Sequence, residues 1–340
     1  MKRKRQSGFT LIEMMAALAM FLVVSSIVMS GIVQMLKTQG TVANRTEMHT
    51  SVRSATELLQ QEIGQAGRIS LPTAVLPVTI TSPIIVTAAP QTFTVPVSST
   101  TNMFVNMLLD VDSGQNFEVV TLTNVAPAFI TAAFSRSHNP TPFAPIPVQV
   151  SGAFGTGIVP PTTASLSCAS AGYTAYTPPA GTTGSGSDCN TLKLYGDING
   201  DGNLLYVEYQ CVVDPTGATP GYLYRNEVAN AIVPGTTKPA VTSSMYLLNN
   251  VMPNPNNGGC FSYQIENASV NGTPVPFVTD VALTITVQTQ MLDPQTNQYQ
   301  QETKALLNIT PRNVFYVWEA TSLGEVPRNQ PIPTNIANIM

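Results

Sequence analysis

The chain begins MKRKRQSG (residues 1–8), and residues 9–36, FTLIEMMAALAMFLVVSSIVMSGIVQML, contain a single ionisable side chain, that of Glu13. As a helix with a rise of ~1.5 Å per residue, residues 9–36 measure about 42 Å. The hydrocarbon core of a bilayer is only about 30 Å thick. Residues 9–36 therefore predict a membrane-spanning helix.

The basic residues before this helix predict its orientation. Residues 2–5 are all Lys or Arg, a flank that keeps the N-terminus in the cytoplasm and sends the chain beyond Leu36 across the membrane. A cleaved secretory signal is one alternative, but its apolar core has only about 7 to 15 residues. A plain membrane anchor is another. It leaves Glu13 unexplained, because a carboxylate at mid-depth in a bilayer costs roughly 2.5 to 3.5 kcal/mol.

The sequence Gly8-Phe9-Thr10-Leu11-Ile12-Glu13 after a short basic leader resembles the class III signal of type IV prepilins and type II secretion pseudopilins. The resemblance implies that a prepilin peptidase cuts between Gly8 and Phe9 on the cytoplasmic side and methylates the new amine of Phe9. It also implies a subunit that crosses the inner membrane once, with a periplasmic head. Such a subunit is then assembled into a filament by an inner-membrane assembly platform.

The same resemblance suggests a role for Glu13. When a subunit leaves lipid and joins other pilin subunits through its N-terminal helix, the buried carboxylate needs a partner. The free amine of Phe9 on a neighbouring chain is the nearest cation that such a family offers. Because removing one member of a buried pair costs about 3 to 5 kcal/mol, we expect this pair to set the axial register of the subunits.

Beyond Leu36 the helix is predicted to continue to about Ala66, with Gly67 as its C-terminal stop. Apolar residues recur there at helical spacing, which indicates a face that docks on a sheet. Gly31 and Gly40 weaken the helix; local unwinding during assembly is one explanation, and close packing or mere tolerance is the other. The docking stripe comprises Met48, Val52, Ala55, Leu59, Glu62, Ile63 and Ala66.

Residues 68–340 are predicted to form a β-rich head, which makes the fold class α+β. The expected domains are the leader 1–8, the membrane half of the helix 9–36, its amphipathic half 37–67, and this head. Short runs of β-branched and aromatic residues between Pro and Gly predict antiparallel strands. The predicted strands are 77–83, 93–96, 117–124, 192–195, 205–213, 261–265, 281–290 and 304–309, with a loop at 160–188 and a β-rich insertion at about 72–161.

The C-terminal part of the chain resembles the closing hairpin of PilW-like minor pilins. The segments that carry this resemblance are 260–263, 281–287 and 310–313. It implies a minor type IV pilin, present in few copies per filament. A type II secretion pseudopilin shares every N-terminal feature and stays an alternative. A pilus-tip adhesin, in which the insertion binds a surface ligand, is a second alternative, and a single-pass sensor or secreted hydrolase is the least favoured.

The cysteines predict disulfides in an oxidising compartment. Cys168, Cys189, Cys211 and Cys260 are even in number and have no C-x-x-C spacing. Three connectivities are possible, of which we favour Cys168 with Cys189 and Cys211 with Cys260. Four buried free thiols are the alternative.

A possible calcium site lies between two predicted strands. Asp197, Asn199, Asp201 and Asn203, followed by Glu208, match the EF-hand loop pattern. The flanking segments are predicted strands, however, so that Glu208 lies ~16 Å beyond Asn203 along an extended chain. A reduced Ca²⁺ site formed by the first four residues is one interpretation, and a hairpin turn that uses Asp, Asn and Gly is the other.

Charge and histidine content argue against several other functions. Charged residues make up 10% of the chain, against roughly 25% in soluble domains. The net charge of −4 comprises +4 on residues 2–5 and −8 on the remainder, so no basic patch predicts nucleic-acid binding. His49, on the predicted helix, and His138, in a predicted loop, are both interpreted as surface residues. No catalytic motif is present, and we expect no enzyme.

Overall fold

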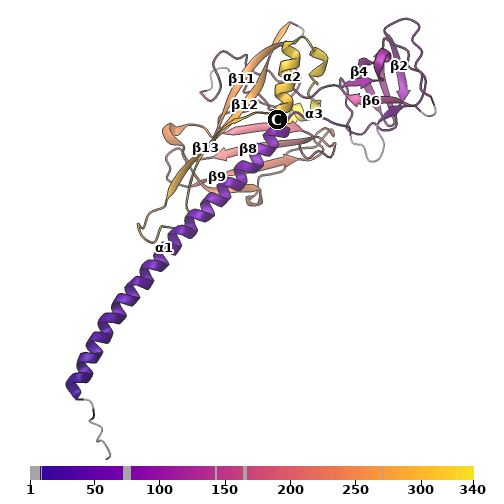
Figure 1. The fold of residues 1–340 in the computed structure, drawn as a ribbon. Helices are drawn as coiled ribbons and strands as arrows, with labels where there is room; N and C mark the ends of the chain where they lie inside the picture. The colour runs from indigo at the N-terminus through magenta and orange to yellow at the C-terminus, as the bar shows by residue number, and fades with distance from the viewer. Residues whose placement is uncertain (1–7, 9, 72–77, 142–143, 164–166, 271) are drawn as a thin grey trace, which may run out of the picture. The chain divides into compact units, whose positions relative to one another are not determined.

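The structure, a computed structural model, describes residues 8, 10–71, 78–141, 144–163, 167–270 and 272–340. Its first element is α1 (Leu11–Gln65), a single helix drawn in indigo and purple in Figure 1. The chain forms two compact units. One unit comprises residues 1–51 and 288–302, and the other comprises residues 52–287 and 303–340. Each is described by itself.

The last part of α1 packs on the β-rich head along the predicted stripe. Leu59, Ile63 and Ala66 are completely buried, and Val52 and Ala55 are nearly so. The helix ends one residue before Ala66, and Gly67 follows in the left-handed region at a φ of 79°. A residue with a Cβ adopts this conformation at a cost, which explains the glycine. The predicted long helix and its stop are therefore confirmed.

The larger sheet has seven strands, all antiparallel in the pairs whose register is described. Its order is β11-β12-β10-β9-β8-β7, and β13 pairs with β12. Along β8 and β9 the registers pair Tyr209 with Arg225 and Cys211 with Leu223. The strands are β7 (Thr191–Gly196), β8 (Leu205–Val212), β9 (Gly221–Val228), β10 (Tyr246–Met252), β11 (Phe261–Val270), β12 (Thr273–Gln288) and β13 (Gln301–Ile309).

The smaller sheet has six strands in the order β1-β6-β3-β4-β5-β2 and is also antiparallel. It falls within the stretch 72–161 that the sequence marks as a β-rich insertion. Its strands, magenta in Figure 1, are β1 (Thr79–Ile80), β2 (Gln91–Pro96), β3 (Leu108–Val111), β4 (Glu118–Ala126), β5 (Phe129–Phe134) and β6 (Ile146–Val150).

Two short helices close the chain. They are α2 (Arg312–Ser322) and α3 (Thr334–Ile339), and neither was predicted from the sequence. Val314 and Val317 of α2 are fully buried, as are Ile336 and Ala337 of α3. The short 3₁₀ helices are Gly114–Asn116, Ser243–Met245, Pro255–Asn257 and Val326–Arg328.

The predicted strands are present, but several boundaries were wrong. The strand predicted at 281–290 is β12, which runs from Thr273 to Gln288 and includes Pro274 and Pro276. Both prolines face β11 in a described register, so β12 tolerates them. The strands β3, β5, β6, β9 and β10 were not predicted. Pro77 of the predicted segment 77–83 lies outside the described residues, and the strand found there is β1.

Candidate functional site

The N-terminal part of α1 exposes a continuous apolar surface. The large apolar side chains from Leu11 to Leu36 are between 45% and 79% exposed. Among the described residues, α1 is the one helix long and apolar enough to cross a membrane. Exposed apolar area of this extent is unfavourable in water. The surface is therefore consistent with anchoring in a membrane and with contact between subunits.

Glu13 and Thr10 cap the start of this helix. One oxygen of the Glu13 carboxylate accepts hydrogen bonds from the backbone N–H and the hydroxyl of Thr10, both at 2.9 Å. The Glu13 N–H in turn faces the Thr10 hydroxyl oxygen at 3.4 Å. This reciprocal arrangement is a capping box, which satisfies backbone donors that the first helical turn leaves free.

The capping box gives Glu13 partners within its own chain, which sequence reasoning missed. The signal was available, because Thr10-Leu11-Ile12-Glu13 has the T-x-x-E spacing of a capping box. Gly8 is exposed, so the position matched to the processed junction is accessible. Phe9, the predicted site of cleavage and methylation, lies outside the described residues.

A loop between β12 and β13 contacts α1 just beyond its apolar part. We call residues 289–300 the collar. Asp293 accepts a hydrogen bond from the Thr41 hydroxyl at 3.0 Å, and the Gln295 amide donates one to the Thr38 hydroxyl at 3.1 Å. The Asn44 amide faces the Met291 carbonyl at 3.5 Å. The collar therefore holds α1 at the point where its apolar surface ends.

Gly40 and Gly31 of α1, the glycines whose role the sequence left open, differ in their surroundings. A Cβ on Gly40 would lie 2.9 Å from Cγ of Pro294 in the collar, too close for an ordinary contact. Close packing thus accounts for Gly40. No heavy atom lies within 4 Å of the corresponding position on Gly31. Packing within the chain therefore does not require a glycine there.

A buried ion pair joins the last part of α1 to the seven-stranded sheet. The Arg225 guanidinium on β9 donates to the Glu62 carboxylate at 2.6, 3.0 and 3.1 Å, and the Tyr209 hydroxyl on β8 donates at 2.5 Å. Burial disfavours the charge of Arg225, but the hydrogen bonds and charge of Glu62 outweigh it and raise the pKa of Arg225. Burial and the Glu62 carboxylate raise the pKa of Tyr209.

The turn predicted as a possible calcium site connects β7 to β8. Asp197 is completely buried, and its carboxylate accepts hydrogen bonds from the Ser70 hydroxyl and, at 3.0 Å, from the Gly202 N–H. Nε of Arg68 lies 3.7 Å from the same carboxylate. Asp197 therefore already has a cationic neighbour and hydrogen-bond donors from the chain.

The other two carboxylates of the pattern, Asp201 and Glu208, also have partners within the protein. Asp201 accepts the N–H of Asn203 at 2.8 Å, which is the contact of an Asx turn. Glu208 lies on β8, where it pairs with Lys238 at 3.0 Å. Across the described ranges, no group of three or more His, Cys, Asp or Glu side chains could hold a metal ion. These contacts favour the turn over the metal site at Asp197, Asn199, Asp201 and Asn203, and calcium binding stays a prediction.

The four cysteines form two disulfides. Cys168 is bonded to Cys189, and Cys211 is bonded to Cys260. These are the pairs favoured from the sequence, and no cysteine is free. The first bond closes the loop before β7, whereas the second joins β8 to the residue that precedes β11. Both bonds therefore stabilise the part of the head built around the larger sheet.

The interpretation of His138 as a surface residue was wrong. Its side chain is completely buried, with Nδ1 2.8 Å from Asp112 and Nε2 2.7 Å from Glu118. The backbone of His138 also pairs with Ile84 in both directions at 2.8 Å. The imidazole thus joins the residue after β3 to the first residue of β4. His49, by contrast, is 56% exposed, as predicted.

Comparison with known families gives one match. Residues 3–29 match the family model of the prokaryotic N-terminal methylation motif. No curated protein and no solved structure matches the chain.

The match indicates the class of protein to which the N-terminus is similar, since residues 3–29 include most of the leader, the capping box and the first part of the exposed apolar helix. It supports a type IV prepilin-like protein. Proteins of this pilin-like class are structural subunits, and the motif implies processing by a peptidase and assembly with other pilins. The resemblance of the C-terminal part to PilW-like minor pilins stays a prediction.

Proposed function

We propose that this chain is a minor type IV pilin, a structural subunit that is incorporated into a filament or primes its assembly. In this proposal residues 1–8 are a leader that prepilin peptidase removes between Gly8 and Phe9, and the amine of Phe9 is methylated. Residues 9–36 cross the inner membrane before assembly. Residues 37–67 carry the periplasmic head, residues 68–340.

The observation that carries the proposal is the exposed apolar surface of α1 with a single carboxylate near its start. This surface requires lipid or other helices as its surroundings. The methylation motif, residues 3–29, includes Glu13 and most of this surface, and it supports assembly over simple anchoring. In the assembled filament, the surface of one α1 would be covered by the α1 helices of neighbouring subunits.

The capping box adds a step to the proposed role of Glu13. In the separate subunit, two donors of Thr10 satisfy the carboxylate, which lowers the cost of holding it in lipid. During assembly the ammonium of Phe9 on a neighbouring subunit approaches the same carboxylate. The ion pair then adds to or replaces the Thr10 contacts, and it fixes the axial position of one subunit against the next.

The test compares processing with assembly in cells that produce the chain. Mass spectrometry of the mature protein should show a methylated N-terminus at Phe9. The Glu13→Ala variant should still be cleaved but should be absent from sheared filament fractions. Glu47→Ala, an exposed carboxylate on the same helix, is the matched control and should be incorporated normally. A mature protein that begins at Met1, or normal incorporation of Glu13→Ala, would refute the proposal.

The pseudopilin alternative differs in the machine that uses the subunit. Deleting the gene should abolish or alter surface filaments if the chain is a pilin, and should block protein secretion if it is a pseudopilin. The adhesin alternative draws on the six-stranded sheet, β1 to β6, which forms a separate sheet within the head. Deleting residues 72–161 should then abolish attachment while filaments still form.

A further inference from the structure

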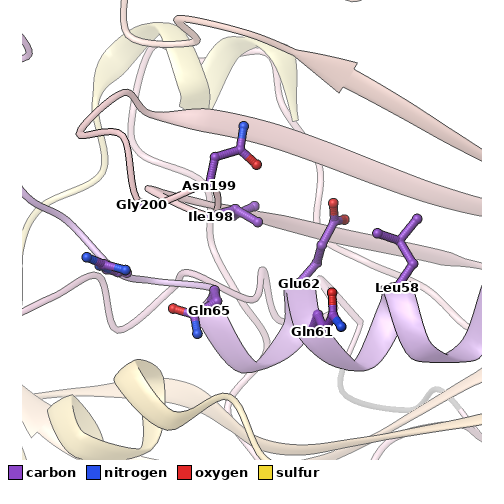
Figure 2. A pocket seen from close by; sticks show the side chains of 8 residues that line it. Leu58, Gln61, Glu62, Gln65, Ile198, Asn199 and Gly200 are labelled. Atoms are coloured by element: carbon purple, nitrogen blue, oxygen red, sulfur yellow. The ribbon is translucent and has the colours of Figure 1, made fainter.

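An open cleft of about 430 Å³ lies at the end of α1, beside the turn between β7 and β8. Figure 2 shows Leu58, Gln61 and Gln65 on α1, with Asn199 and Gly200 across from them. Neither the methylation motif nor the proposed assembly through the N-terminal part of α1 uses this cleft. Its lining comprises Leu58, Gln61, Glu62, Gln65, Arg68, Ile198, Asn199 and Gly200.

The two charged residues in the lining are not equivalent. Glu62 is nearly buried and is held by Arg225 and Tyr209, so that its negative charge is compensated. The side chain of Arg68 is 44% exposed, and its only ion pair with a described residue is the 3.7 Å approach of Nε to Asp197. Asp197 itself is completely buried and does not line the cleft. The charge available to a ligand in the cleft is therefore positive.

The terminal nitrogens of Arg68 are free to bind. Neither Nη atom donates a hydrogen bond to any described residue. A Cβ on Gly200 would lie 3.2 Å from Nη1 of Arg68, so the glycine keeps this side of the guanidinium open. Gly200 also has a φ of 72°, at which a larger residue is strained. The turn therefore leaves a planar fork of N–H donors uncovered at the edge of the cleft.

We infer that this cleft binds a carboxylate-bearing, hydroxyl-rich ligand, of which a uronic acid unit is the simplest example. A carboxylate accepts two parallel hydrogen bonds from a guanidinium fork, a pairing that adds geometric specificity to the charge attraction. The side-chain amides of Gln61 and Gln65 each offer donors and an acceptor, the combination that recognises hydroxyl groups.

Size and lining agree with this class of ligand. Small-molecule sites usually occupy about 300 to 1,000 Å³, and the cleft falls at the lower end of this range. Leu58 provides an apolar surface for the C–H face of a sugar ring. The absence of a second available cation among the described lining residues argues against a doubly charged phosphate ester. A single carboxylate matches the single guanidinium.

The inference is tested by calorimetry on the full chain in detergent micelles. Sodium glucuronate should bind saturably with a Kd on the order of 1 mM, the range of a single charge-assisted contact with a few hydrogen bonds. Glucose tests the hydroxyl groups without the carboxylate, and acetate at equal ionic strength tests the carboxylate alone. Both should bind at least tenfold more weakly than glucuronate.

Variants assign the binding to the cleft. Arg68→Gln should weaken glucuronate binding at least tenfold, and Gln65→Leu, which keeps the guanidinium, should weaken it severalfold. Arg312→Gln is the matched control, because Arg312 lines the neighbouring cleft with Gln61 and Gln65 and should leave binding unchanged. Circular dichroism verifies that each variant is folded.

Three outcomes would overturn the inference: no saturable binding of glucuronate, binding of acetate or glucose as tight as that of glucuronate, or normal binding by folded Arg68→Gln and Gln65→Leu. The measurement uses unassembled protein. It therefore stands or falls separately from the proposed role in filaments.

Discussion

The ion pair between Glu62 and Arg225 holds α1 on the seven-stranded sheet, and its contribution to the free energy of unfolding can be predicted. The side chains are 7% and 17% exposed, and the closest N–O distance is 2.6 Å. In Glu62→Gln the guanidinium keeps its charge but loses its buried counter-ion. Breaking a buried pair in this way costs about 3 to 5 kcal/mol. Arg225 retains Glu227, which is 51% exposed, so we expect about 3 kcal/mol, near the lower limit.

The same helix offers a matched control. Glu57 pairs with Arg53 at 2.7 Å, but these side chains are 56% and 78% exposed. An exposed pair at this helical spacing contributes only about 0.3 to 0.5 kcal/mol. Glu57→Gln should therefore change the free energy of unfolding by a small fraction of the effect of Glu62→Gln, although the two substitutions are chemically identical.

The assay is denaturant unfolding of the full chain in detergent micelles, followed by near-ultraviolet circular dichroism with the disulfides intact. The double variant Glu62→Gln/Arg225→Met removes both charges and should recover part of the loss, since a buried pair replaced by neutral residues is often tolerated. Equal losses for Glu62→Gln and Glu57→Gln would refute the reasoning. The reasoning would also be refuted if the double variant lost more free energy of unfolding than Glu62→Gln and Arg225→Met lose in total when made singly.

Three further predictions concern the head. Replacing Cys211 and Cys260 by Ala removes a crosslink with a separation of 49 residues and should lower the free energy of unfolding by about 4 kcal/mol in the chain-entropy estimate; an unchanged denaturation midpoint would contradict it. If internal contacts suffice for the 197–203 turn, Ca²⁺ should give no heat and no rise in melting temperature, whereas a saturable rise would support the metal hypothesis. Burial raises the pKa of Tyr176 from 10.0 to about 12. The raised pKa stabilises the folded state fully below pH 10, and this stabilisation is lost as the pH rises towards 12. The absorbance of ionised tyrosine should therefore show a phase at high pH, and Tyr176→Phe should make that phase smaller.

The sequence predicted the features that depend on local pattern. The apolar run, the buried stripe from Val52 to Ala66, and the glycine stop at Gly67 each follow from helical periodicity and backbone sterics. The strands on either side of the 197–203 turn were also predicted, because β-branched and aromatic residues mark both of them. Each of these features is encoded in one continuous segment of the chain.

The features that the sequence did not reveal depend on contacts between distant segments. Whether His138 is buried is decided by Asp112 and Glu118, which come from other parts of the six-stranded sheet. No local spacing relates these three residues. The arrangement of the strands into two sheets was missed for the same reason, since strand pairing is set by long-range contacts that local propensity does not determine.

A chain with so few charges uses several of them where separate segments meet. Besides Glu62 with Arg225, and His138 with its two carboxylates, Arg328 near the C-terminus pairs with Asp110 on β3 at 3.2 Å. Burying such groups contributes little net stability, but a misplaced partner leaves a charge unpaired, which is costly. We therefore expect these pairs to select one docking geometry among the many that an interior rich in Val, Ile and Leu permits. On this reasoning Asp110→Asn should alter the docking of the C-terminal segment, measured by hydrogen exchange across residues 326–340, more than it alters exchange across β8 and β9.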